Sequence, residues 1–90
     1  MKRSSVYRFP ETRHVQELSP GRRISLVEEE LLEAQRAFWD EDPDGVIDGL
    51  WLVIQAAESV LRGFSPLSVI RGFARAKVKS LKRGDYEAGR

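Results

Sequence analysis

The sequence predicts an all-α protein, with an antiparallel helical hairpin and a third helix that together form a helical bundle on dimerisation. The apolar residues recur at helical spacing, which is the main sequence signal for α-structure. At three places a Ser or Asp stands directly before a proline: Ser19-Pro20, Asp42-Pro43 and Ser65-Pro66. A capping side chain followed by proline in the first turn is a strong signal for the start of a helix.

These signals predict helices over about residues 20–40, 43–62 and 66–83. Gly63 and Gly84 stand where the second and third helices should end. We therefore expect an irregular N-terminal arm at 1–18, a helical domain at 19–84 and a C-terminal tail at 85–90. Within the arm, Val6–Phe9 is a candidate for docking in an extended form.

Each helix of the predicted hairpin carries an apolar stripe with alternating steps of three and four residues. The stripe of the first helix comprises Ile24, Val27, Leu31, Ala34 and Phe38, and that of the second comprises Ile47, Leu50, Ile54, Ala57 and Leu61. Such stripes are typical of helices that pack side by side. The second helix has another stripe, formed by Val46, Val53, Ala56 and Val60. Two stripes need two partners, so we expect a second subunit to cover one of them in a four-helix core.

Composition restricts the class of protein. Ninety residues with 41% hydrophobic and 32% charged residues indicate one small folded domain, and at this size association often supplements a limited core. The absence of cysteine excludes disulfides and thiolate metal sites and favours the cytoplasm. No secretory signal and no apolar run of about 20 residues is present, so a membrane span is not expected.

The net charge of +1 conceals a strong asymmetry along the chain. Residues 1–25 carry a net charge of +4, residues 26–62 carry −8, and residues 63–90 carry +5. An acidic centre between basic ends suits a site for a cation and a polyphosphate. Equally, the basic ends of a dimer could simply neutralise its acidic core.

The acidic centre contains a candidate metal site. Glu30 and Glu33 are three residues apart on the first predicted helix and Asp48 lies near the start of the second, so an antiparallel hairpin could bring the three carboxylates together. Mg²⁺ prefers carboxylate oxygens and retains waters or phosphate oxygens in its remaining positions. The alternative is an acidic face in contact with solvent.

The segments Leu26–Glu33 and Val46–Leu50 resemble the MazG-like all-α nucleoside triphosphate pyrophosphohydrolases, a group that includes phosphoribosyl-ATP pyrophosphohydrolase. Glu29-Glu30-Leu31-Leu32-Glu33 matches the E-E-x-x-E motif of that family. The resemblance implies Mg²⁺ as cofactor, with Mn²⁺ as a substitute, and hydrolysis of a nucleotide between its α- and β-phosphates. It also implies that Glu29 or Glu30 acts as the general base.

The second family motif, E-x-x-D, is incomplete in this chain. Asp48 can stand for the glutamate, but Trp51 occupies the position of the aspartate. Three carboxylates could still hold one Mg²⁺ with the help of substrate phosphates. The alternative is a relative that retained the helical bundle of the family and lost its catalytic activity.

The third predicted helix carries a basic stripe. Arg75, Lys79, Lys82 and Arg83 are the candidate substrate-binding residues, because Lys and Arg on one helix face suit phosphate contacts. A solvated basic face near a helix C-terminus is the alternative. The acidic centre and the absence of a recognisable motif argue against a nucleic-acid partner.

Two functions therefore remain open at the level of sequence. The first is a Mg²⁺-dependent nucleotide pyrophosphohydrolase, a homodimer or dimer of dimers with a nucleotide as substrate. The second is a non-catalytic helical dimer that serves as a protein-interaction module on the same fold.

Overall fold

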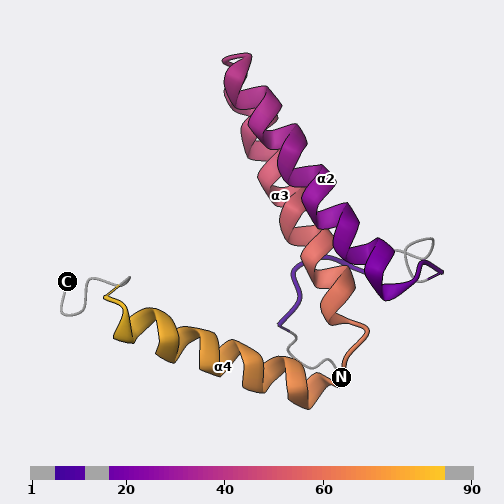
Figure 1. Ribbon diagram of the computed structural model, residues 1–90, viewed down its shortest axis with the longest axis vertical. Helices are drawn as coiled ribbons and strands as arrows, with labels where there is room; N and C mark the ends of the chain where they lie inside the picture. The colour runs from indigo at the N-terminus through magenta and orange to yellow at the C-terminus, as the bar shows by residue number, and fades with distance from the viewer. Residues whose placement is uncertain (1–5, 12–16, 85–90) are drawn as a thin grey trace.

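A computed structural model describes residues 6–11 and 17–84 of the chain, and it confirms the all-α prediction for these residues. The helices are α2 (Pro20–Trp39), α3 (Pro43–Leu61) and α4 (Pro66–Lys82). Figure 1 shows α2 and α3 side by side as a long hairpin, with α4 directed away from it. The described residues contain no strand.

Each helix begins where the sequence predicts, because each Ser-Pro or Asp-Pro pair caps it. The Ser19 hydroxyl accepts a hydrogen bond from the Arg22 amide at 3.2 Å, and the Asp42 carboxylate accepts one from the Gly45 amide at 3.1 Å. The Ser65 hydroxyl accepts one from the Ser68 amide at 3.2 Å. These bonds satisfy amide groups that would otherwise lack partners in the first helical turn.

Small residues form the contact between α2 and α3. A Cβ added to Gly49 of α3 would lie 3.0 Å from the Cβ of Ala34 on α2. Nearer the interhelical turn, a Cβ added to Gly45 would lie 3.0 Å from the Cβ of Ala37. Because glycine lacks a side chain, the two backbones approach closely at these positions, and Ala34 is buried between them.

The stripe of α3 that faces α2 is not the one that the sequence analysis assigned to it. The half-buried stripe is the second one described above: Val46, Val53, Ala56 and Val60. The larger side chains of the expected stripe are instead exposed: Ile47, Leu50, Ile54 and Leu61. The close approach at Gly49 explains the difference, since it leaves no room for large side chains between the helices.

On α2, too, the buried residues differ from the expected stripe. Of its expected stripe, Ala34 is buried and Val27 half-buried, whereas Ile24, Leu31 and Phe38 are exposed. Among the described residues, Ala34 and Val69 are the only buried apolar side chains. A single chain thus leaves most of its large apolar side chains in contact with solvent.

Helix α4 has few contacts with the hairpin. Of the described helices, only α2 and α3 pack along each other. The exposed apolar residues of α4 are Leu67, Ile70, Phe73, Val78 and Leu81. It is therefore an amphipathic helix whose apolar side chains, apart from the buried Val69, are largely left uncovered by α2 and α3.

Candidate functional site

The contact between Ala34 and Gly49 determines which acidic residues share a side of the hairpin. Glu33 directly precedes Ala34, and Asp48 directly precedes Gly49. Because α2 and α3 run antiparallel, the residue before each contact residue turns toward the same side. Glu33 and Asp48 therefore lie on one side of the hairpin, and both are exposed.

Glu30 and Glu29 occupy different environments on α2. Glu30 lies one turn before Ala34 and is half-buried close to the contact between the helices. Glu29 is exposed and accepts an ion-paired hydrogen bond from Arg22, with Nη1 and Oε2 2.8 Å apart. Of these two candidates for a general base, Glu29 is thus already engaged with a cation.

The carboxylates of Glu30, Glu33 and Asp48 are the donor type that Mg²⁺ prefers. Within residues 6–11 and 17–84, however, no three acidic or histidine side chains are arranged to hold a metal ion. The structure brings the candidate acids to one side but not to a common centre. A shared ion would require the exposed side chains of Glu33 and Asp48 to converge.

Trp51, at the position of the missing aspartate, contacts the N-terminal arm. Its ring lies 6.2 Å from the ring of Phe9 in an edge-to-face arrangement, and the guanidinium of Arg8 lies 5.8 Å from the ring centre of Trp51. These are favourable aromatic and cation–π geometries. The arm candidate thus contacts α3 through Arg8 and Phe9, but its backbone bends at these residues and does not take the expected extended form.

Glu58 and Arg62 hold the arm by its backbone. The two oxygens of the Glu58 carboxylate accept hydrogen bonds from the amides of Arg8 and Phe9, at 2.8 and 3.0 Å. Nη2 of Arg62 donates to the carbonyl oxygen of Phe9 at 2.6 Å, and its guanidinium lies 4.1 Å from the ring centre of Tyr7. The sequence analysis missed Glu58, although one acidic residue in the apolar run from Leu52 to Val60 is a signal for a buried acceptor.

The basic candidates lie on the projecting helix. Arg75, Lys79 and Lys82 line a shallow, open pocket of about 400 Å³ together with Ala74 and Val78. Arg83, the fourth candidate, is the C-cap residue of α4. Since α4 does not pack on α2 or α3, these cations do not meet the acids of the same chain.

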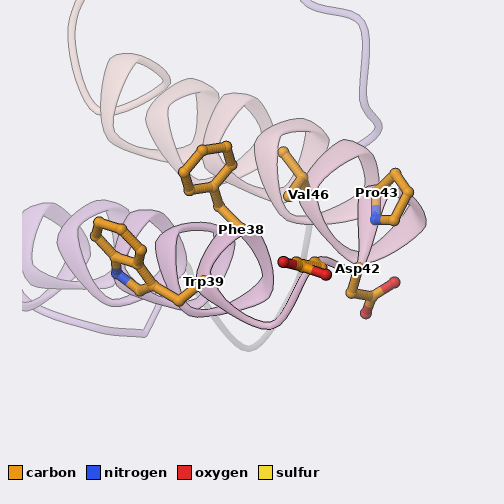
Figure 2. Close-up of a pocket in the computed structure, with 6 residues that line it drawn as sticks. Phe38, Trp39, Asp42, Pro43 and Val46 are labelled. Carbon is orange, nitrogen blue, oxygen red and sulfur yellow. The ribbon is translucent and has the colours of Figure 1, made fainter.

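The other side of the hairpin is apolar. Gln35 and Leu50, which directly follow the two contact residues Ala34 and Gly49, line an open groove of about 380 Å³ with Leu31 and Phe38. It continues into a pocket of about 490 Å³ at the interhelical turn, where the Phe38 ring projects toward α3 and Val46 (Figure 2). We call these two connected surfaces the apolar groove.

Comparisons with known proteins give no relative for this chain: no family model, no curated protein and no solved structure matches it. Among the described residues, no helix has the length and apolar character needed to cross a membrane.

Proposed function

We propose that the chain is a Mg²⁺-dependent nucleotide pyrophosphohydrolase that works as an assembly of identical subunits. The observation that carries the proposal is the placement of Glu33 and Asp48, from different helices, on the same side of the hairpin as the half-buried Glu30. The apolar groove lies on the opposite side. Association through the groove would therefore leave the acids accessible to a substrate.

The roles of the acidic residues follow from their positions. Glu33 and Asp48 are exposed and able to change rotamer, so they would serve with Glu30 as metal ligands. Bound Mg²⁺ would neutralise the charge on the phosphate oxygens. The ion pair between Glu29 and Arg22 makes Glu30 the better candidate for the base that accepts a proton from the attacking water.

The basic residues of α4 would act across subunits. Arg75, Lys79 and Lys82 share one pocket on a helix that points away from its own hairpin. In an assembly they would reach the acidic side of a neighbouring chain and contact the phosphates there. Charge complementarity between the acidic residues 26–62 and the basic residues 63–90 supports this arrangement.

Calorimetric titration with Mg²⁺ and Mn²⁺ tests the proposal most directly. We expect saturable binding to the wild-type chain, loss of binding in Glu33→Gln, and unchanged binding in Glu28→Gln. Glu28 is a matched control because it is an exposed glutamate of the same helix. Release of pyrophosphate from a panel of nucleoside triphosphates should likewise be lost in Glu33→Gln and unchanged in Glu28→Gln.

The contact of Trp51 with Phe9 favours a second candidate function. The position that the family resemblance reserves for a ligand instead supports the docking of the arm. On this observation, the chain would be a non-catalytic helical module that assembles through its apolar groove. A folded chain that associates, binds neither metal ion and releases no pyrophosphate would establish this second function over the first.

A further inference from the structure

The described contacts between the arm and α3 are those of a peptide with its receptor. The Glu58 side chain, only 8% exposed, uses both carboxylate oxygens to bind two successive backbone amides of the arm. Arg62, the C-cap residue of α3 one turn after Glu58, binds the backbone carbonyl of Phe9. A carboxylate is a strong acceptor for backbone N–H groups, and a buried polar group needs such partners.

The contacts also select side chains. The Tyr7 ring lies under the Arg62 guanidinium, whereas Arg8 and Phe9 both contact the Trp51 ring. The side chains of three successive arm residues are thus contacted by two residues, Trp51 of α3 and Arg62 at its C-cap. Pro10 follows them and lines, with Phe9, a small pocket beside Gln55 and Ser59.

We propose that Trp51, Glu58 and Arg62 form a peptide-binding site whose ligand is an aromatic–Arg–aromatic segment with a bent backbone. The chain's own Tyr7–Phe9 occupies this site and can be displaced from it. The same ligand could also come from the arm of a second copy. The proposal does not depend on metal binding or on pyrophosphohydrolase activity.

The site can be tested in the full-length chain by weakening the internal ligand. Phe9→Pro removes both the aromatic ring and one of the two amides that donate to Glu58. In a Trp39→Phe background, Trp51 is the sole tryptophan and reports on the site by fluorescence. The probe is a capped synthetic peptide of residues 6–11.

We expect the peptide to bind the Phe9→Pro chain saturably and to bind the wild-type chain much more weakly, because the wild-type arm competes at high effective concentration. Adding Glu58→Gln to Phe9→Pro should weaken peptide binding about 10- to 100-fold, because a charge-assisted hydrogen bond is lost. Glu33→Gln in the same background is the matched control and should leave binding unchanged. A peptide with proline in place of Phe9 should not bind.

Equal binding to the wild-type and Phe9→Pro chains, or an affinity that Glu58→Gln leaves unchanged, would overturn the proposal. Absence of any peptide binding to the Phe9→Pro chain would overturn it too, provided that circular dichroism shows the chain to be folded. Sedimentation distinguishes the two sources of the arm. If the arm is exchanged between copies, Phe9→Pro lowers the mass of the assembly, and if the arm binds within its own chain, the mass stays the same.

Discussion

Gly49 of α3 lies so close to Ala34 of α2 that a methyl group on the glycine would be 3.1 Å from the Ala34 Cα. The atom in the way belongs to the backbone, so a rotamer change cannot relieve the contact. The hairpin can accept a side chain at residue 49 only if the two helices move apart. This contact fixes the rotation of both helices and hence the separation of the acidic side from the apolar groove.

Gly49→Ala should therefore lower the free energy of unfolding by about 1–2 kcal/mol, measured by urea denaturation with circular dichroism. The loss should appear even though alanine favours a helix over glycine by about 1 kcal/mol. Gly21→Ala on α2 is the control, because an added Cβ there meets no atom within 4 Å. It should leave stability unchanged or raise it, and a gain in both variants would contradict the close contact.

Leu50→Glu should reduce the assembly proposed above to single chains, as measured by sedimentation at several concentrations. Leu50 lines the apolar groove and is 46% exposed, and a charged side chain there would be buried without a partner at a subunit interface. Leu32→Glu introduces the same charge on an exposed leucine outside the groove lining and should leave the mass unchanged. An unaltered mass for Leu50→Glu would show that the groove is not the interface.

The helix boundaries could be predicted closely because they depend on local chemistry. A cap such as Ser19 followed by Pro20 acts within one turn, and no distant residue needs to be known. The observed helices begin at the predicted residues and end one residue earlier than predicted, at Trp39, Leu61 and Lys82. The antiparallel pairing followed from the short turn between α2 and α3.

The rotation of the helices could not be predicted from apolar periodicity. Large residues such as Leu50 and Ile54 form a clear stripe, but a stripe does not reveal whether it faces the nearest helix or another chain. The small residues Ala34 and Gly49 determine which stripe faces the other helix, because they permit the closest approach of α2 and α3. Their role becomes visible only when the two helices are placed together.

The candidate site could be predicted only in part. Glu33 and Asp48 share a side of the hairpin, as helical spacing predicts, but their metal binding stays a prediction. Trp51 stands at the position of the missing ligand, and its neighbours in the structure come from the arm, more than 40 residues away along the chain. No local pattern encodes a contact of that sequence separation.

Trp51→Asp should strengthen Mg²⁺ binding at least about tenfold relative to Trp51→Asn, because it adds a fourth carboxylate one turn beyond Asp48. Both variants remove the ring that contacts Phe9, so their difference isolates the charge. Calorimetry supplies the affinities, and the stability of the two variants should agree within about 0.5 kcal/mol. Equal affinities would mean that residue 51 does not face the ion.

Helix α4 should be the least protected of the three helices whenever the chain is monomeric. It has little packing against the other described helices, and most of the stability of a helix in a protein comes from tertiary packing. In the Leu50→Glu chain we therefore expect the amides of α4 to exchange hydrogen faster than those at the centre of α3.

In the Leu50→Glu chain, one substitution within α4 and one at its N-cap should change the rate of amide hydrogen exchange in α4 in opposite directions. Gly72→Ala should slow exchange up to about fivefold, because the nearest atom to an added Cβ is the flexible end of Arg75, 3.5 Å away. Ser65→Ala should accelerate exchange by a similar factor of about five, because it removes the cap that accepts from the Ser68 amide. The expectation would be wrong if the amides of α4 exchanged as slowly as those of α3 in the Leu50→Glu chain and neither substitution changed their exchange rates. The stability of α4 would then come from packing that does not depend on association through the apolar groove.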